Sequence, residues 1–395
     1  MKIAMVSMNA GPLARLGGVE SGGQSVVVDC LSRALADGGN EVTIFTQRDD
    51  PTLPDRLITA AGVHIVYVSA PAPLANATEA FRAQLAAEWM ADPPDIVHAH
   101  AWMSGTAAIA AARPFGIPVV QTFHGMARAK RGRHDSSDAV RLGEEAALVR
   151  AAARIVATSS AEVFALLGMG ASPGAIKLIP CGVDLELFRP LPRTAPRAGQ
   201  PFRVATLSRL VPDAGAGDVI EALAHSAGTE LIVGGGSCSA SDLAGDPDAL
   251  ELAARAQARG VRGRVMFQGH IKRDDVASFL RSADLVICAP WYDSIGTVAL
   301  EAMACGVPVI VSSVGSHVDA VADGLSGAHV PPQAARQIAY AIESLKADAP
   351  RRERFARFGV ERTSARYGWS RIAAETFEVY ATVAGRSARL TRSRA

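Results

Sequence analysis

Short, continuously apolar segments rich in β-branched residues recur along this chain, separated by stretches with helical periodicity. Because their apolar character does not alternate, they predict strands buried on both faces, as in a parallel sheet covered by helices. The candidates in the first half are KIAMVSM, EVTIFT, VHIVYV, DIVHAH, PVVQTF and RIVATS. Between the first two, SVVVDCLSRALADGGN places its apolar residues on one helical face and ends in a Gly-Gly-Asn stop signal.

The segment 189–201, RPLPRTAPRAGQP, interrupts this pattern with the residues of a linker. The pattern then restarts with FRVATLS, ELIVGGG, RVMFQG, DLVICAP and VPVIVSS. We therefore predict an α/β protein with two Rossmann-like, doubly wound parallel-sheet domains, at 1–195 and 200–366, facing each other across a cleft. Because ligands of such sheets bind beyond the carboxyl ends of the strands, the cleft is the predicted site.

The composition excludes several other classes of protein. Of the 395 residues, 49% are hydrophobic and 20% are charged, with a net charge of +1, which is typical of a globular protein and not of a polyanion-coating one. No apolar run reaches the roughly 20 residues of a membrane-spanning helix, and the chain begins as a strand without a signal peptide. Its five cysteines are odd in number and none forms a C-x-x-C pair, which disfavours a disulfide framework and a zinc site. We expect a cytoplasmic protein.

A glycine-rich loop, LGGVESGGQS, follows the first predicted strand. Its spacing is not the G-x-G-x-x-G of dinucleotide-binding folds, so a nicotinamide cofactor is disfavoured. Gly22 and Gly23 stand at the start of the next predicted helix, where free amides and the helix dipole favour an anion. The alternative is a tight turn that needs glycine for its backbone angles.

The segment 289–313, APWYDSIGTVALEAMACGVPVIVSS, carries the strongest chemical signal. It places Asp293 after a buried strand and Glu301 eight positions later, on a helix that ends near Gly306. The start of that helix offers free amides to a phosphate or to sugar hydroxyls. Glu301 lies about two turns further on, where its carboxylate could accept hydrogen bonds from a ribose diol.

This segment resembles the E-x7-E signature of retaining GT-B glycosyltransferases of the GT4 type. That family includes sucrose-phosphate synthases and inositol-phosphate glycosyltransferases. The resemblance continues in the same order through most of the chain, in the blocks GGQSVVVDCLSRALADGGNEVTIFTQRDD, DIVHAHAWMSG, PVVQTFHG, IPCGVDLELF, LSRLVPDAG, DGLSGAHVPP and YGWSRIAAETFEVY. It implies the GT-B fold, with a final helix at about 369–385 that returns to the N-terminal domain.

The resemblance also implies the activity. A hexosyl unit would pass, with retention of configuration, from a nucleotide diphosphate sugar held mainly by the second domain to a small hydroxylated acceptor held mainly by the first. The family uses no bound metal and no cofactor, because basic side chains and helix N-termini meet the diphosphate charge. Retention is thought to use same-face attack assisted by the departing phosphate, so no enzymic nucleophile is expected.

The resemblance carries roles onto residues of this chain. Glu301 matches the ribose-binding acid, and Gly22 with Gly23 matches the loop over the donor phosphates. His124 in QTFHG matches a catalytic histidine near the donor sugar; the alternative is a hydrogen-bonded histidine at a strand end. With His124, the two acids Asp293 and Glu301 are the expected catalytic residues. The remaining matches, all to donor-binding positions, are Arg209, Ser294, Ile295, Gly296, Thr297 and Val298.

Two positions depart from the family. The first acid is normally Glu, and Asp293 is shorter by about one methylene, so its contact with the sugar could lengthen or pass through water. Ala214 stands where the family has a diphosphate-binding lysine, and its loss could remove transition-state stabilisation. These departures motivate an alternative, a degenerate GT-B protein that binds nucleotide-sugar or a partner with little turnover. A GT-B epimerase is a further, weaker alternative.

A basic cluster, ARAKRGRH at 127–134, follows His124 in a predicted loop. Lys130, Arg131 and Arg133 would suit a phosphorylated acceptor. The alternatives are a solvated loop or peripheral attachment to anionic lipid, although no apolar helical stripe accompanies the charge. Nucleic-acid binding is disfavoured because the charge is local. His98 and His100 are interpreted as structural, hydrogen-bonding histidines, since no metal-ligand spacing accompanies them.

Overall fold

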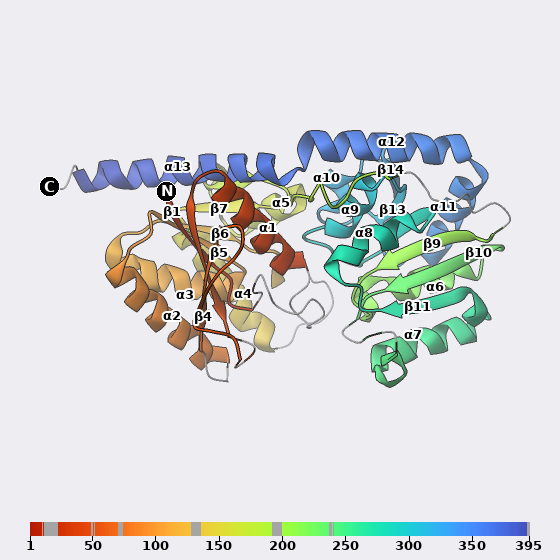
Figure 1. Ribbon diagram of the computed structural model, residues 1–395, viewed down its shortest axis with the longest axis horizontal. Helices are drawn as coiled ribbons and strands as arrows, with labels where there is room; N and C mark the ends of the chain where they lie inside the picture. The colour runs from red at the N-terminus through yellow and green to blue at the C-terminus, as the bar shows by residue number, and fades with distance from the viewer. Residues whose placement is uncertain are drawn as a thin grey trace. The chain divides into compact units, whose positions relative to one another are not determined.

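The computed structural model describes residues 1–9, 11, 23–48, 50, 52–69, 74–127, 136–191, 200–236, 239 and 241–392 (Figure 1). These residues form two compact units. Unit 1 contains the described residues up to Cys181 together with those from Trp369 onward, and unit 2 contains Gly182–Gly368. The division along the chain therefore lies before the predicted linker, and the last helix belongs to unit 1.

In its described part, unit 1 is built on an eight-stranded sheet with the order β3-β4-β2-β1-β5-β6-β7-β8. All neighbours are parallel except β3 and β4. The strands are β1 (Lys2–Val6), β2 (Glu41–Gln47), β3 (Arg56–Ile58), β4 (His64–Val68), β5 (Ile96–His100), β6 (Val119–Thr122), β7 (Arg154–Ala157) and β8 (Ile176–Leu178). The helices are α1 (Gly23–Asp37), α2 (Leu74–Ala91), α3 (Trp102–Ala112), α4 (Ser136–Ala151), α5 (Ser160–Gly168) and α13 (Trp369–Arg392), with short 3-10 turns at Arg113–Phe115 and Pro173–Ala175.

The core of unit 1 confirms the prediction that continuously apolar segments form strands buried on both faces of a sheet. Every residue of β5 and β6 is buried, because α3 covers one face of the sheet and α13 contacts β5 and β7 on the other. Helix α1 packs against α13, and its buried residues Val27, Val28, Leu31 and Leu35 repeat at helical spacing.

Unit 2 has a six-stranded, fully parallel sheet in the part of the chain that is described, with the order β11-β10-β9-β12-β13-β14. Its strands are β9 (Phe202–Leu207), β10 (Thr229–Gly234), β11 (Val265–Gly269), β12 (Leu285–Cys288), β13 (Val309–Ser312) and β14 (Gly327–Val330). Its helices are α6 (Ala216–Leu223), α7 (Pro247–Ala258), α8 (Arg273–Arg281), α9 (Thr297–Ala304), α10 (His317–Ala320), α11 (Ala335–Ala347) and α12 (Ala349–Arg366), with 3-10 turns at Pro212–Ala214, Leu243–Gly245 and Arg262–Arg264. Both sheets confirm the predicted doubly wound architecture.

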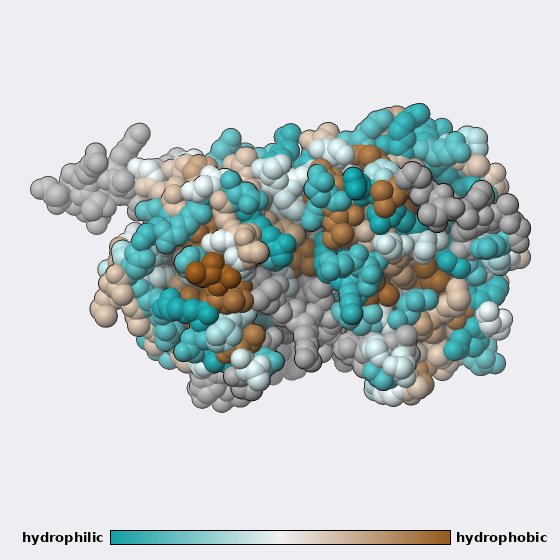
Figure 2. Space-filling view, viewed as in Figure 1, coloured by the Kyte–Doolittle hydropathy of each residue, from teal (hydrophilic) through white to brown (hydrophobic). Residues whose placement is uncertain are grey.

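Helix α12 packs on α9 and α11 in unit 2, and hydrophilic side chains lie over it in Figure 2. At Gly359 the backbone of α12 comes close to α9, since a Cβ there would lie 3.1 Å from Met303. This close contact holds α9 against α12. No helix in the described residues combines the length and the apolarity needed to cross a membrane.

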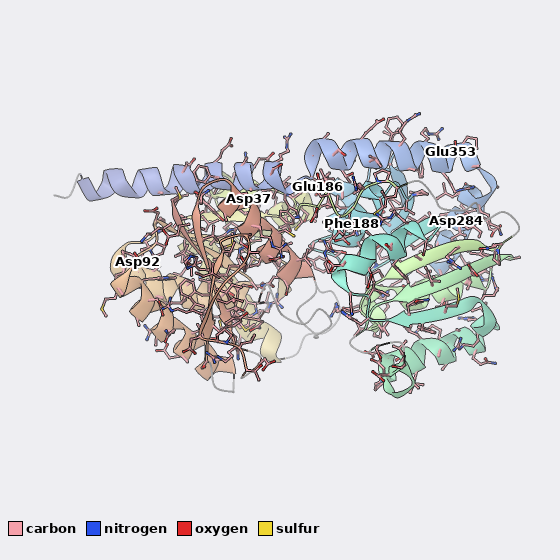
Figure 3. All side chains as sticks on the ribbon, in the orientation of Figure 1. Asp37, Asp92, Glu186, Phe188, Asp284 and Glu353 are labelled. Atoms are coloured by element: carbon pink, nitrogen blue, oxygen red, sulfur yellow. The ribbon has the colours of Figure 1, made fainter. Side chains whose placement is uncertain are left out.

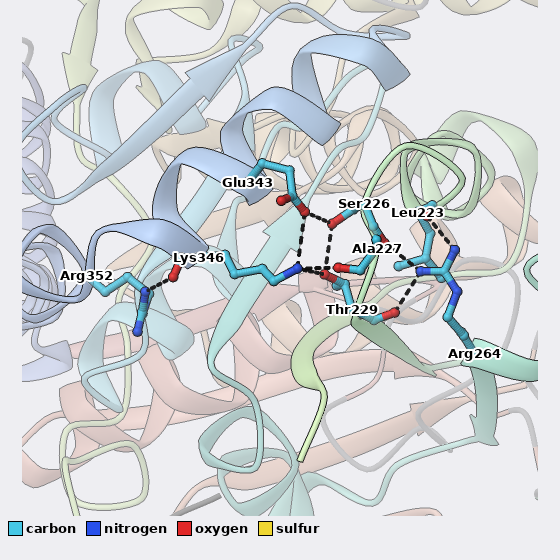
Figure 4. A network of polar contacts seen from close by, with 8 residues as sticks. All are labelled: Leu223, Ser226, Ala227, Thr229, Arg264, Glu343, Lys346 and Arg352. Carbon is cyan, nitrogen blue, oxygen red and sulfur yellow. Dashed lines mark hydrogen bonds and ion pairs between the residues drawn. The ribbon is translucent and has the colours of Figure 1, made fainter. Parts of the chain in front are cut away.

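A polar network closes the amino-terminal edge of the unit 2 sheet, where β10 begins (Figure 4). Arg264 donates to the carbonyl oxygens of Leu223 at 2.8 Å, Ser226 at 2.6 Å and Thr229 at 3.0 Å. From α11, Lys346 donates to the carbonyl of Ala227. These bonds satisfy the last carbonyls of α6 and the turn after it, so this edge is closed by structural contacts. Ligands of such sheets bind at the opposite edge, beyond the carboxyl ends of the strands.

Candidate active site

Loops of unit 2 meet at the carboxyl ends of the neighbouring strands β9, β12 and β13. The loop after β12 contacts the loop after β9, because the amide of Trp291 donates to the carbonyl of Asp213 at 2.9 Å. It also contacts the loop after β13, because the amide of Ser316 donates to the carbonyl of Asp293 at 3.2 Å. Two glycines permit this packing: a Cβ would lie 1.8 Å from the Ala289 carbonyl oxygen at Gly215, and 1.5 Å from that of Asp293 at Gly315.

Asp293 organises the start of α9. Its Oδ1 accepts the amides of Ile295 and Gly296, both at 2.7 Å, and so folds residues 293–296 into a tight turn. Gly296 is the N-cap residue that precedes the helix, with φ 69° and no side-chain cap. The amides of the first turn, which include those of Thr297 and Val298, therefore have no capping side chain, as an anion site at a helix N-terminus requires.

His317 is the second partner of Asp293, and sequence reasoning missed it. Its Nε2 lies 3.4 Å from Oδ2 of Asp293, while its Nδ1 lies 3.2 Å from the carbonyl oxygen of Ser312 and donates to it. The imidazole is 1% exposed, and burial lowers its pKa although Asp293 acts in the opposite direction. Two backbone amides thus hold the short aspartate in place, and the His317 ring lies against its second carboxylate oxygen.

Glu301 lies on the inner face of α9 and is 2% exposed. Burial raises the pKa of its carboxyl group, while the guanidinium of Arg273 acts in the opposite direction. Arg273, the first residue of α8, donates to Oε1 of Glu301 at 2.5 Å, and its guanidinium lies 4.6 Å from the ring centroid of Phe188. Phe188 is labelled beside α8 in Figure 3. Arg273 was not predicted, since it stands 28 positions before Glu301 without a local signal.

Two further positions of unit 2, Arg209 and Ala214, were expected from the sequence to lie near a donor diphosphate. Arg209 follows β9 and lies 3.8 Å from Asp213, with both side chains more than half exposed, a pair that contributes little to stability. Ala214 ends the 3-10 turn Pro212–Ala214 in the same loop. Arg209 and the 293–298 segment therefore follow the adjacent strands β9 and β12, as their sequence positions suggested.

In unit 1, His124 follows β6 with a left-handed backbone, φ 54°. Its Nε2 lies 2.9 Å from Nδ1 of His100, at the end of the neighbouring strand β5. His98, on the same strand, lies 2.6 Å from the Tyr380 hydroxyl and 2.8 Å from Thr122 Oγ1. The interpretation of His98 and His100 as hydrogen-bonded histidines is confirmed.

The remaining predicted residues are only partly described. Gly23 is the first residue of α1, and the next residue, Gln24, donates to the Ser7 hydroxyl at 3.1 Å. Gly22 and the three basic residues assigned to the acceptor, Lys130, Arg131 and Arg133, lie outside the described residues. Within the described ranges, no group of three or more His, Cys, Asp or Glu side chains could hold a metal ion.

Comparison with known proteins identifies the family of this chain. Residues 21–187 match the family model "Glycosyltransferase Family 4", and residues 191–362 match "Glycosyl transferases group 1". D-inositol 3-phosphate glycosyltransferase 2 of Catenulispora acidiphila is 33% identical over 96% of this chain and 94% of its own length. The corresponding enzyme of Kribbella flavida is 33% identical over 96% and 95%.

Solved structures show the same architecture. Sucrose-phosphate synthase from Thermosynechococcus elongatus superposes with a TM-score of 0.88 at 28% identity, covering 96% of this chain and 98% of its own. Anabaena HepE, in complex with UDP-glucose, gives a TM-score of 0.79 at 22% identity, over 97% and 100%. The chain therefore belongs to glycosyltransferase family 4 and is a glycosyltransferase of the GT-B fold.

Proposed function

We propose that this enzyme moves a hexosyl unit from a nucleoside diphosphate sugar to a hydroxyl group of a small phosphorylated acceptor, with retention of configuration. The observation that carries the proposal is the uncapped start of α9, with Asp293 folding the turn before it and buried Glu301 on the helix itself. Together they offer an anion site and a carboxylate about one helical turn apart.

In this proposal the donor lies along α9. The amides around Gly296, Thr297 and Val298 receive the diphosphate and the sugar, and the helix dipole stabilises the charge that develops on the leaving phosphate. Arg273 already binds Oε1 of Glu301, so we assign the ribose diol to the other carboxylate oxygen. Arg209 supplies positive charge from the loop after β9, and the chemistry needs neither a metal nor another cofactor.

The relatives support the choice of substrates. Two of them are named as D-inositol 3-phosphate glycosyltransferases, and the solved neighbours include a sucrose-phosphate synthase and a protein in complex with UDP-glucose. A UDP-sugar donor and a phosphorylated polyol or sugar acceptor are therefore the first candidates. We assign the acceptor phosphate to Lys130, Arg131 and Arg133, whose charges suit a dianion.

We also propose that the enzyme works in the cytoplasm. Cys288 and Cys305 are free thiols, and both are buried. Free cysteines are typical of a reducing compartment such as the cytoplasm.

The test is a matrix of UDP-, GDP- and ADP-sugars against inositol, inositol phosphate and sugar phosphates, with product detected by mass spectrometry. We expect one donor to be consumed, and the phosphorylated acceptors to outperform their unphosphorylated forms. Glu301→Gln should raise the donor KM, whereas Glu353→Gln, an exposed change on α12, should leave it unaltered. Failure of every donor to be consumed, or to shift the thermal transition, would overturn the proposal.

A further inference from the structure

The buried carboxylate of Glu301 has a counter-ion on the neighbouring helix of unit 2. Its Oε1 accepts a hydrogen bond at 2.5 Å from the guanidinium of Arg273, the first residue of α8, and α8 packs on α9, which carries Glu301. A hydrogen bond between two charged groups is stronger than a neutral one, and a planar guanidinium donates in fixed directions. The pair therefore fixes the position of one oxygen of the carboxylate.

A turn at the start of unit 2 holds the guanidinium in turn. The carbonyl of Asp184 accepts the Phe188 amide at 2.8 Å, and Oδ1 of Asp184 accepts two more amides of the same turn, both at 3.0 Å. This turn presents the ring of Phe188, whose centroid lies 4.6 Å from the guanidinium carbon of Arg273. Phe188 is fully buried, in one core cluster with residues of α8 and α9. Arg273 is therefore held between an aromatic ring and the Glu301 carboxylate.

The charge of Glu301 depends on this arrangement. Burial raises the pKa of its carboxyl group, and the nearby Asp184 acts in the same direction. Arg273 opposes both effects, through its charge and through its hydrogen bond. Without the guanidinium, the protonated acid would be favoured at this position, because a buried carboxylate needs a partner that compensates for its lost hydration.

A ribose diol is best bound by the ionised form of such an acid. Its two hydroxyl groups are hydrogen-bond donors, and both oxygens of a carboxylate accept, whereas protonation turns one of these oxygens into a donor. Arg273 donates to Oε1 from the side of α8, and Oε2 is the oxygen assigned above to the diol. The quality of that contact should therefore depend on a residue that does not itself touch the ribose.

We propose that Arg273 is a positioning residue that holds Glu301 as an ionised carboxylate with Oε2 available to the ribose, and so makes the enzyme selective for nucleotides with an intact diol. This inference rests on the proposed function, in which Glu301 binds the ribose of the donor. It extends the donor site to α8 and to the turn that carries Phe188, neither of which supplies a contact with the nucleotide.

The test measures the preference of the full chain for UDP over 2′,3′-dideoxy-UDP by calorimetry, or the same pair of the nucleotide that the substrate matrix selects. We expect the wild type to bind UDP at least tenfold more tightly, because the analogue leaves a buried carboxylate oxygen without its partners. Arg273→Met should weaken UDP about tenfold and leave the analogue within about twofold. Arg281→Met is a matched change at the other end of α8, where the side chain donates to the carbonyl of Arg189, and should alter neither affinity.

The Glu301→Gln variant separates positioning from direct contact. If Arg273 acts through Glu301, then Arg273→Met adds little to the loss of UDP affinity that Glu301→Gln already causes. Additive losses would overturn the proposal, and so would equal weakening of UDP and the dideoxy analogue by Arg273→Met. A wild type that binds both nucleotides equally would overturn it even if the enzyme transfers sugar. Failure to bind any nucleoside diphosphate would instead overturn the proposed function, and this inference with it.

Discussion

Replacing Arg273 with methionine tests the electrostatics around Glu301 on α9, the helix proposed to bind the donor. The change leaves the carboxylate of Glu301 buried without its cationic partner, while methionine can still pack on Phe188. Breaking a buried ion pair from one side typically costs about 3–5 kcal/mol, and we take roughly 3 kcal/mol because the Arg273 side chain is 25% exposed. For a unit of this size, that corresponds to a fall in Tm of roughly 6–12 °C.

The pH dependence of the stability lost in Arg273→Met tests this prediction more specifically. Burial raises the pKa of Glu301 in the folded state, and Arg273 is the opposing influence, so the variant raises that pKa further. A carboxyl group with a raised folded pKa contributes stability below its ordinary pKa and loses it as the pH rises through the folded value. The deficit of Arg273→Met relative to the wild type should therefore be largest near pH 8 and shrink as the pH falls towards the ordinary glutamate value of about 4.3.

The assay is urea denaturation of both proteins at pH 5 and pH 8, followed by circular dichroism. The double variant Arg273→Met with Glu301→Gln should recover most of the loss at pH 8, because no buried charge is left unpaired. A deficit that is independent of pH and persists in the double variant would refute the reasoning, since it would show that Arg273 acts through packing alone.

Four further predictions concern the loops proposed to bind the donor phosphates and the need for metal. Gly315→Ala should displace the 293–296 turn, because its Cβ would lie 1.5 Å from the Asp293 carbonyl oxygen; donor affinity measured by calorimetry should fall at least tenfold. Gly324→Ala, with φ +72° but open space around its Cβ, should cost only about 1 kcal/mol of backbone strain and leave donor affinity intact, so equal effects of the two changes would be contradictory. Ala214→Lys should raise kcat/KM about tenfold or more by restoring a cation to the diphosphate, and an unchanged value would show that another group already supplies that charge. Gly23→Val should abolish turnover while leaving the circular dichroism spectrum unchanged. Full activity of this variant would show that the glycine loop serves only as a tight turn. Dialysis against EDTA should leave the initial rate unchanged, and a loss restored by a divalent cation would contradict metal-independent transfer.

Features encoded in contiguous segments were predictable from the sequence. Continuous apolar runs predict the long buried strands. Asp293 and Glu301 could be recognised because they are eight positions apart on one loop–helix segment. The three-residue strands β3 and β8 were missed because most of their positions are exposed or half-buried. Strand β14, Gly-Ala-His-Val, lacks the run of β-branched residues that signals a buried strand.

The partners of the site residues were not predictable in the same way, because tertiary contacts create them. His317 reaches Asp293 because β13 neighbours β12, and His100 reaches His124 because β5 neighbours β6. Arg273 reaches Glu301 through the packing of α8 on α9. The strand order of a doubly wound sheet would have suggested the first two pairs, since the residues that follow neighbouring parallel strands lie together at one edge.

The stereochemistry of the product tests the central proposal most directly. The full chain is incubated with UDP-α-glucose and inositol phosphate, or with the donor and acceptor that the substrate matrix selects, and the anomeric coupling constant of the product is read by ¹H NMR. We predict an α-linked product that forms with the wild type and is strongly reduced by Glu301→Gln. A β-linked product, or an α-linked product formed equally fast by Glu301→Gln, would contradict retaining transfer at this site.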